Sequence, residues 1–299
     1  MHEQQGRLTM THLTFDCFFQ DRALDCLRRA LRLALDEDGQ DLTSNALFPP
    51  DVQAQAEIVA KEQTLVVGLP LVSMVLEMVE EQSAEGVVLL VDEGALVEPG
   101  TVVAVIQAPA RVILKAERVI LNAICHLSGV ANLTRTYVQR LGSAHTRLLD
   151  TRKTLPGLRH AEKYAVLLGG GKNHRMDLEQ MLMLKDNHID RAGGITPAVQ
   201  ALRAAYAPCP PIEVECRTPD EVLEAASLSV TRIMLDNMPV HELRQVLALI
   251  PRGIETEVSG GVNLETIAAI AAAGPDFVSV GRLTHSAPAA DYSMRIRIA

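Results

Sequence analysis

Residues 257–283, EVSGGVNLETIAAIAAAGPDFVSVGRL, decide the fold class because they hold two apolar strands with a helix between them. The segments EVSGGV (257–262) and VSVGRL (278–283) each predict a short strand that ends in glycine. The alanine-rich segment between them predicts a helix over 263–273, with Asn263 as its N-cap. A strand, a helix and a second strand in this order form a right-handed crossover, so the two strands lie parallel in one sheet.

The same alternation of strand and helix extends back along the chain to about residue 112. A long helix is expected over 112–141, and it leads to a strand over 148–152. Later strands are expected to end at Lys185, Glu215, Asp236, Glu257 or Val258, and Val280, with helices near 196–206, 219–227 and 239–249 between them. These six strands are fewer than the eight of a closed barrel. We therefore predict an α/β fold with an open or incomplete (β/α) barrel over 116–286.

The first 115 residues predict a smaller N-terminal α+β sandwich domain instead. Alternating hydrophobicity predicts strands over 53–60, 86–92 and 101–107, with a helix near 70–80 after the first of them. An amphipathic helix is expected from the N-terminus to about residue 30.

Composition excludes several classes of protein. The net charge of −9 argues against nucleic acid and anionic membranes as partners, and the 3% aromatic content argues against stacking on bases. The five cysteines form no CxxC pair, which predicts reduced thiols and a cytoplasmic location. No signal-peptide core and no uncharged run long enough to span a bilayer are found.

Polar and charged residues follow six of the predicted strands, where loops at the carboxyl ends of barrel strands form active sites. These groups are 150–153 (DTRK), 185–188 (KDNH), Glu213 with Glu215, Asp236 with Asn237, 259–261 (SGG) and 281–282 (GR). Loops are polar in general, but six groups in register favour a site over that simpler explanation. We therefore expect these side chains to meet at one mouth of the barrel.

The residue types at this mouth indicate an anionic ligand. Residues 150–188 hold seven Lys and Arg against five acids, although the whole chain is acidic. Arginine grips a carboxylate or phosphate through two parallel hydrogen bonds, and lysine supplies a compact charge. The glycine loops after the last two strands are typical of phosphate sites, because glycine allows the backbone close to the ligand. Tight turns and a solvated basic face are the simpler alternatives.

Glu215 and Asp236 end neighbouring predicted strands. Two carboxylates beside phosphate loops suit Mg²⁺, which commonly takes one or two carboxylates together with ligand phosphates. They could equally orient ribose hydroxyls or lysine side chains. Arg118 lies on a polar stripe of the long helix with Arg111 and Lys115, and composition alone does not raise it above a solvated position.

The chain resembles the quinolinate phosphoribosyltransferase family over roughly residues 36–295. The resemblance is carried, in order, by DLTS (41–44), AERVILNAICHLSGVA (116–131), DTRKTLPGLR (150–159), GGGKNHR (169–175), LKDNHI (184–189), IEVEC (212–216), IMLDNM (233–238), SGGV (259–262) and THSAP (284–288). It implies that residues 287–299 complete the N-terminal domain (1–115). It also implies a homodimer with shared active sites and leaves a higher oligomer open.

The resemblance further implies roles for individual residues. Arg118 would reach the partner's site and contact quinolinate, and Lys153, Glu215 and Asp236 would be catalytic, the two acids also holding Mg²⁺ in part through water and substrate. The other substrate-binding positions would be Thr151, Arg152, His174, Arg175, Lys185, Ser259, Gly260, Gly261, Gly281, Arg282 and His285. Arg282 departs from the pattern, because a small residue is expected after Gly281.

The implied activity is transfer of a phosphoribosyl group from phosphoribosyl pyrophosphate to quinolinate with loss of CO₂, a step of NAD biosynthesis. The alternative is the related molybdenum-transport accessory family, which shares the fold and the phosphate loops. Residues 93–103 (EGALVEPGTVV) also resemble the turn of biotinyl and lipoyl carrier domains, but no lysine lies between Lys61 and Lys115 to be modified. Nicotinate as the acceptor would require fewer cations than this chain supplies.

Overall fold

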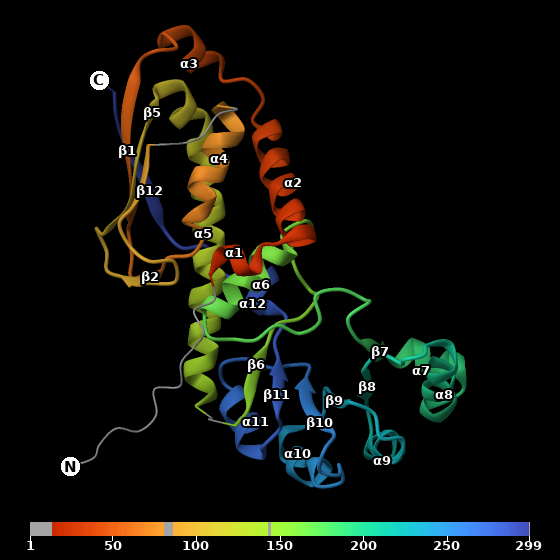
Figure 1. Cartoon of the computed structure of the whole chain (residues 1–299). Helices are drawn as coiled ribbons and strands as arrows, with labels where there is room; N and C mark the ends of the chain where they lie inside the picture. Colours follow the sequence, from red (N-terminus) through yellow and green to blue (C-terminus); the bar gives the residue numbers. More distant parts are fainter. Residues whose placement is uncertain (1–13, 81–85, 143–144, 299) are drawn as a thin grey trace, which may run out of the picture.

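The computed structural model describes residues 14–80, 86–142 and 145–298. It has two parts, a layered N-terminal part and a barrel-like part, and the long helix α5 (Ala110–Leu141) runs through both (Figure 1). Gly129 allows a close crossing on this helix, because a Cβ there would lie 2.0 Å from the carbonyl oxygen of Pro288. The predicted boundary at 115/116 falls inside α5. Among the described residues, no helix combines the length and the apolar character needed to cross a membrane.

The N-terminal part is built on an antiparallel four-stranded sheet in the order β12-β1-β5-β3. Its strands are β1 (Gln53–Ala60), β3 (Val87–Leu89), β5 (Val102–Pro109) and β12 (Tyr292–Ile298). Strand β12 comes from the C-terminus and pairs with β1 from Ala54↔Ile298 to Ala60↔Tyr292. Alternation along β1 buries Ala54, Ala56 and Ile58 on one face, and α5 packs against β1, β5 and β12.

Helices α2 and α4 pack on α5 beside the sheet (Figure 1). The other elements of this part are α1 (Phe15–Phe18), α2 (Asp21–Glu37), α3 (Leu42–Leu47), α4 (Pro70–Glu80) and a ribbon of β2 (Thr64–Leu65) with β4 (Leu96–Val97). The predicted N-terminal helix is displaced along the chain: it begins at Asp21 and continues to Glu37, with Leu27, Leu31 and Leu35 on its buried face. Residues 1–13 of that prediction lie outside the described residues.

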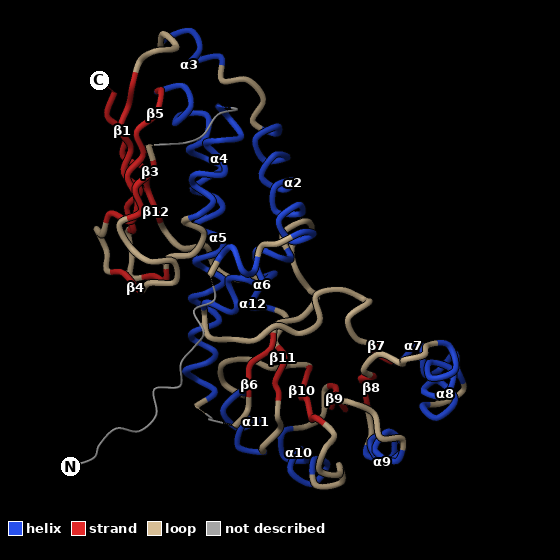
Figure 2. The backbone as a smooth tube through the Cα atoms, viewed as in Figure 1, coloured by secondary structure: helices blue, strands red, loops and turns tan. Residues whose placement is uncertain are grey.

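The barrel part contains six parallel strands in the order β6-β11-β10-β9-β8-β7, drawn in red in the lower half of Figure 2. They are β6 (Arg147–Leu149), β7 (Leu182–Leu184), β8 (Ile212–Cys216), β9 (Arg232–Asp236), β10 (Glu255–Ser259) and β11 (Phe277–Ser279). The helices are α6 (Arg159–Leu168), α7 (Asp186–Ala192), α8 (Ile195–Ala205), α9 (Pro219–Ser227), α10 (Val240–Leu247), α11 (Ile267–Ala273) and α12 (Arg282–His285).

The predicted α/β fold with an open barrel and a smaller N-terminal domain is confirmed. Strands β6 and β7 are the two ends of the sheet order, so consecutive strands along the chain do not pair there. The free edge of β6 instead meets the segment after α6, through a parallel bridge between Leu149 and Lys172. The barrel is therefore open because a short irregular segment, rather than the next full strand, lies beside β6.

Two predicted boundaries differ from the structure for local reasons. Strand β6 ends at Leu149 rather than at residue 152, and the Asp150 amide donates to the carbonyl oxygen of Lys172. Helix α11 begins at Ile267 rather than at 263. The Asn263 carboxamide oxygen does accept backbone N–H bonds, from Glu265 and Thr266, but it caps a turn that precedes the helix.

Candidate active site

A cavity of about 440 Å³ lies at the carboxyl ends of the barrel strands. It is lined by Thr151, Arg152, Lys153, His174, Arg175, Met183, Lys185, Glu215, Met234, Asp236, Asn237, Glu257, Ser259 and Ser279. These residues come from the loops after β6, α6, β7, β8, β9, β10 and β11 or from the strands themselves. The structure thus brings most of the predicted site residues to one place.

The cavity gathers positive charge from three different loops. Arg152 and Lys153 follow β6, Arg175 follows α6, and Lys185 follows β7. The Arg175 guanidinium donates to the carbonyl oxygen of Met181 at 2.7 Å, and burial together with the charge of Arg152 lowers its pKa. Among the described residues, the buried Nε of Arg152 has no hydrogen-bond partner. An anion between these side chains would relieve their mutual repulsion.

The two predicted carboxylates end adjacent strands. Glu215 is the fourth residue of β8 and accepts a hydrogen bond from Lys185 Nζ at 2.8 Å. Asp236 is the last residue of β9 and accepts from the side chain of Asn237 at 2.8 Å. Both carboxylates are half-buried and line the cavity, so each can still meet a ligand.

This pair of acids fits the donor set of Mg²⁺, which takes few protein carboxylates and several oxygens from water and phosphate. A different trio, His174, Glu213 and Glu257, has ligand atoms within 4.8 Å of one another and is buried. That trio fits a cation poorly. Arg232 already donates to Glu257 at 2.9 Å, and Arg175 N donates to His174 Nδ1 at 2.7 Å, which leaves Nε2 as the protonated ring nitrogen.

The floor of the cavity is charged rather than apolar. His174 Nε2 lies 3.1 Å from Glu213 Oε2 and 3.6 Å from Glu257 Oε2, and all three side chains are buried. Burial raises the pKa of Glu213 to about 7, and burial with the charge of Glu213 raises that of Glu257 to about 7. Burial lowers the pKa of His174. His174 thus belongs to the cavity lining, but its ring points toward Glu213 and Glu257 at the floor.

Glycine brings two strand ends close to their neighbours. Gly260 has φ +86°, and a Cβ there would lie 2.2 Å from Asn237 Oδ1, so only glycine fits without displacing Asn237. A Cβ on Gly281 would lie 3.0 Å from Lys153 Cδ and 3.5 Å from His285 Nε2. Gly281 therefore places the end of β11 directly against Lys153 and His285.

Arg282 and His285 lie on α12, beside the glycine of β11. Arg282 is exposed and does not line the cavity. Burial raises the pKa of Tyr137 on α5, and the charge of Arg282 beside the tyrosine hydroxyl partly opposes that shift. His285 is exposed and its Nδ1 lies 2.7 Å from Ser286 Oγ. Gly261, with φ +63°, is exposed at the edge of the SGG loop.

Arg118 lies on α5, outside the lining of the cavity of its own chain. The two cations that precede it on the same stripe are occupied: Arg111 donates to the carbonyl oxygens of Phe48 and Asn45, and Lys115 to those of Leu35 and Gly39. The Arg118 side chain is 66% exposed, and its ion pair with Glu117 is long, at 3.9 Å. It is thus the member of the stripe that is available to another molecule.

Several residues of the site were not assigned a role from the sequence. Met183, Met234, Glu257 and Ser279 line the cavity, and Lys163 is buried beneath it. Asn237 and Asp150 were both expected at the barrel mouth; Asn237 does line the cavity, whereas Asp150 is buried beneath it. The available signal was the polar residue inside an otherwise apolar strand, as at Ser279 in 277–280 (FVSV). Lys163, in the middle of α6, had no comparable signal, because a single lysine in a helix is usually on a solvated face.

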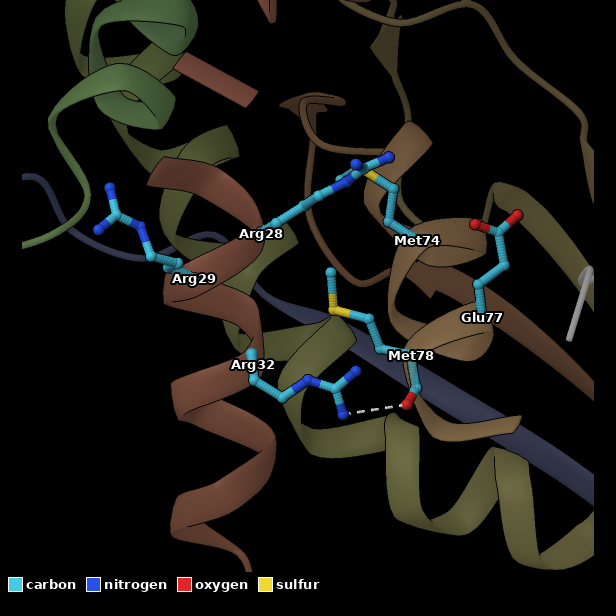
Figure 3. Close-up of a pocket in the computed structure, with 6 residues that line it drawn as sticks. All are labelled: Arg28, Arg29, Arg32, Met74, Glu77 and Met78. Atoms are coloured by element: carbon cyan, nitrogen blue, oxygen red, sulfur yellow. Dashed lines mark hydrogen bonds between the residues drawn. The ribbon is translucent and has the colours of Figure 1, made fainter. Parts of the chain in front are cut away.

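Another hollow lies between α2 and α4, away from the strand ends (Figure 3). It is lined by Arg28, Arg29, Arg32, Met74, Glu77 and Met78. Arg32 donates to the carbonyl oxygen of Met78 at 3.2 Å, and Arg29 points away from the hollow and pairs with Asp25 at 2.8 Å. It has neither paired carboxylates nor a glycine loop, so the chemistry belongs to the barrel cavity.

Comparison with known protein families agrees with this geometry. The model of the quinolinate phosphoribosyl transferase N-terminal domain matches residues 41–128, and that of the C-terminal domain matches residues 130–295. The chain belongs to the quinolinate phosphoribosyltransferase family. Together the two matches run from residue 41 to residue 295 and leave out α1 and α2, and the junction between them falls within α5.

Individual relatives are similar over most of their length. The chain is 39% identical over 258 residues to the probable nicotinate-nucleotide pyrophosphorylase [carboxylating] of Bacillus subtilis, covering 86% of this chain and 88% of the relative. It is 38% identical over 276 residues to the nicotinate-nucleotide pyrophosphorylase [carboxylating] of Mycobacterium leprae, covering 91% and 95%. The solved structure of NadC from Streptococcus pyogenes matches with a TM-score of 0.86 at 36% identity, over 94% of this chain and 99% of that one.

Proposed function

We propose that this family member transfers the phosphoribosyl group of phosphoribosyl pyrophosphate to quinolinate, with loss of CO₂, to give nicotinate mononucleotide and pyrophosphate. The observation that carries the proposal is the convergence of Arg152, Lys153, Arg175 and Lys185 on one cavity beside Glu215 and Asp236. Both family matches name quinolinate phosphoribosyl transferase, so the molybdenum-transport alternative is set aside.

The cations account for the acceptor. Quinolinate carries two carboxylates on neighbouring ring carbons, and Arg152 with Arg175 offers two guanidinium groups, each of which can hold a carboxylate through paired hydrogen bonds. Lys185 adds a third positive charge, partly neutralised by Glu215 at 2.8 Å. Nicotinate, with one carboxylate, would leave part of this charge unbalanced, which favours the dianion as the acceptor.

The carboxylates and glycine loops account for the donor. Ser259, Gly260 and Gly281 would hold the 5′-phosphate. Glu215 and Asp236 would bind the ribose hydroxyls, and Lys153 would lie between the acceptor and the donor and contact both. When pyrophosphate leaves, the anomeric carbon becomes cationic, and nearby carboxylates stabilise that charge. Mg²⁺, held by Glu215 and Asp236 together with substrate oxygens, would neutralise the departing pyrophosphate.

The bond between the ring nitrogen and the anomeric carbon makes that nitrogen positive. The adjacent carbon can then lose its carboxylate, because the electron pair of the broken C–C bond is stabilised next to the positive nitrogen. A proton completes that carbon and CO₂ leaves. The ring therefore supplies its own electron sink, and no organic cofactor is required by this chemistry.

Arg118 supports a shared site in a homodimer. It is exposed, weakly paired and too far along α5 to line the cavity of its own chain. A two-fold interface that sets α5 of one subunit over the barrel mouth of the other would let Arg118 complete the quinolinate site. The five free cysteines agree with the cytoplasm as the compartment of this activity.

The activity is tested by incubating the protein with quinolinate, phosphoribosyl pyrophosphate and Mg²⁺ and measuring nicotinate mononucleotide. We expect product with quinolinate and much less with nicotinate in its place, and removal of Mg²⁺ with a chelator should abolish turnover. Product from nicotinate at an equal rate, or no product from quinolinate, would contradict the proposal.

The shared site is tested by mixing Arg118→Ala with Arg152→Ala, each of which we expect to lose most of the activity by itself. Subunit exchange would form hybrid dimers with one intact site, restoring up to about a quarter of the wild-type activity. Exchange demonstrated by differently tagged subunits without any recovery would show that Arg118 acts elsewhere.

A further inference from the structure

At the open seam of the barrel, the end of β6 is held to the segment after α6 by one isolated parallel bridge and by buried side chains, rather than by pairing with a regular strand. Strands β6 and β7 lie at opposite ends of the sheet order, yet the loops that carry Arg152 and Arg175 lie on the β6 side of this seam. Beneath them, Asp150 and Lys163 form an ion pair whose side chains are both 0% exposed. Among the hydrogen bonds of the described residues, the two side chains of this pair reach the cavity lining only at the backbone of His174.

The Asp150 carboxylate joins the two loops that hold the arginines. It directly precedes Thr151 and Arg152, and its Oδ1 accepts from the backbone N–H of His174 at 2.8 Å. The carboxylate Oδ2 accepts from the side chain of Asn173 at 2.6 Å, and the backbone N–H of Asp150 donates to the carbonyl oxygen of Lys172. One carboxylate thereby fixes the start of the loop after β6 against the segment 172–174.

Lys163 closes the same network from the helix layer. Its ammonium, from the middle of α6, donates to Asp150 Oδ1 and to the carbonyl oxygen of His174, the latter at 2.9 Å. Asn173 donates to the carbonyl oxygen of Lys163 at 2.9 Å. Burial raises the pKa of Asp150 and lowers that of Lys163, and their attraction opposes both effects, so each charge depends on its partner.

We propose that Asp150 and Lys163 are positioning residues that set the spacing between Arg152 and Arg175 required by the two carboxylates of quinolinate. The inference rests on the proposed function. A sheet would normally set such a spacing, but here the two arginine loops meet where the regular sheet is interrupted. Each arginine is within two residues of a backbone group that the network holds, so a shift of the network moves both guanidinium groups.

The phosphate loops provide an internal comparison. Ser259 and Gly260 follow β10, and Gly281 follows β11, strands that are joined to their neighbours by regular parallel pairing. The network of Asp150 and Lys163 has no hydrogen bond to these residues among those of the described chain. Loss of the network should therefore weaken binding of quinolinate more than binding of phosphoribosyl pyrophosphate.

The test uses the full chain and separate calorimetric titrations with quinolinate and with phosphoribosyl pyrophosphate. The main variant is the double substitution Asp150→Asn with Lys163→Met, because it removes both charges and leaves no unpaired charge in the interior. We expect its quinolinate affinity to fall by about 10- to 100-fold, as for a misplacement on the order of 1 Å, and its phosphoribosyl pyrophosphate affinity to stay within about twofold. The single variant Lys163→Met should also lose thermal stability.

The matched control is Asp276→Asn. The Asp276 carboxylate also joins neighbouring strands, by accepting from the N–H and hydroxyl of Thr256, but it lies at the amino ends of β10 and β11, away from the cavity. We expect it to lower the melting temperature without changing either affinity. If the double variant behaves like Asp276→Asn, losing stability but keeping wild-type quinolinate affinity, the positioning role is wrong.

The wild-type protein separates this inference from the proposed function. Wild-type binding of quinolinate and formation of nicotinate mononucleotide, with unchanged quinolinate affinity in the double variant, would overturn the inference alone. Equal weakening of both ligands would also overturn it, because a general loss of structure would then explain the result. Absence of quinolinate binding to the wild-type protein would overturn the proposed function and this inference with it.

Discussion

The two parts of the molecule bury very different side chains. In the N-terminal part, Ala54, Ala56 and Ile58 of β1 pack into an apolar core that continues through α5. The barrel strands bury apolar side chains too, but with them the charged side chains of Glu213, Arg232 and Glu257. Apolar burial is a favourable term in folding, whereas charges in the interior persist only when they are paired.

The difference shows how stability and function are divided. The barrel holds charges where a structural barrel would hold branched apolar side chains, because an anionic substrate needs fixed cations and those cations need buried partners. Helix α5 has buried residues along its whole length, from Ala110 to Leu141, and joins the charged part to the apolar one. Four predictions test this division.

The largest effect is expected at the two cavity arginines. Arg152→Ala or Arg175→Ala should each cost about 2–5 kcal/mol of transition-state stabilisation, because each leaves a substrate carboxylate without its partner. This corresponds to a fall in kcat/KM for quinolinate of roughly 30- to 4,000-fold. Steady-state kinetics with both substrates measures this, with the melting temperature as the control for folding. Wild-type turnover in either variant would break the assignment of the carboxylate site.

The next effect concerns stability in the N-terminal part. Ile106 of β5 is 0% exposed in the apolar core, so Ile106→Ala should lower the free energy of unfolding by about 2–5 kcal/mol. Denaturant unfolding measures the loss, and kcat/KM of the fraction that remains folded should be close to that of the wild type. A kinetic loss as large as that of Arg152→Ala would mean that the two parts are not divided in this way.

A smaller effect, with a defined pH dependence, is expected at the barrel floor. The pKa of Glu257 is raised by burial and by Glu213 from its ordinary value of 4.5 to about 7, so the folded state holds a proton that the unfolded state releases between these values. The free energy of unfolding should therefore fall as the pH rises from about 4.5 to 7, by at most about 3 kcal/mol for this group.

Glu257→Gln should flatten that part of the profile, since the amide does not titrate. The groups that face Glu257 and also influence its pKa are Glu213, His174, Arg232 and Ser279. Unfolding curves collected across this pH range for the variant and the wild type make the comparison. An unchanged slope in the variant would show that Glu257 does not hold the proton.

The smallest effect is expected at an exposed ion pair outside the cavity lining. Arg217 pairs with Glu221, four residues further along the chain, at 2.6 Å, and its side chain is exposed. Exposed ion pairs contribute little because water and salt screen them. Arg217→Ala should leave both the melting temperature and kcat/KM unchanged within error, and a clear loss of either would show that charge outside the cavity lining matters as well.

The chain pattern was sufficient to predict the class of fold and the mouth of the barrel. Parallel strands that alternate with helices place their carboxyl ends at one edge, so the meeting of the charged residues at the ends of β6, β7, β8 and β9 could be predicted. The direction of individual side chains was not predictable in the same way. The ring of His174 is directed at Glu213 and Glu257 because strand order places β8 and β10 beneath it, and no local pattern encodes that order.

The sequence by itself determined the elements, their alternation and the chemistry of the residues at the strand ends, because these depend on local hydrophobic period and residue type. The family resemblance implied that residues 287–299 complete the N-terminal domain, and the strand count predicted an open barrel. Only the tertiary structure decided that β12 pairs with β1, that the opening lies between β6 and β7, and that Lys163 turns inward to meet Asp150. These features depend on which distant segments pack together, and that choice follows from burial summed over the whole chain rather than from any short stretch of it.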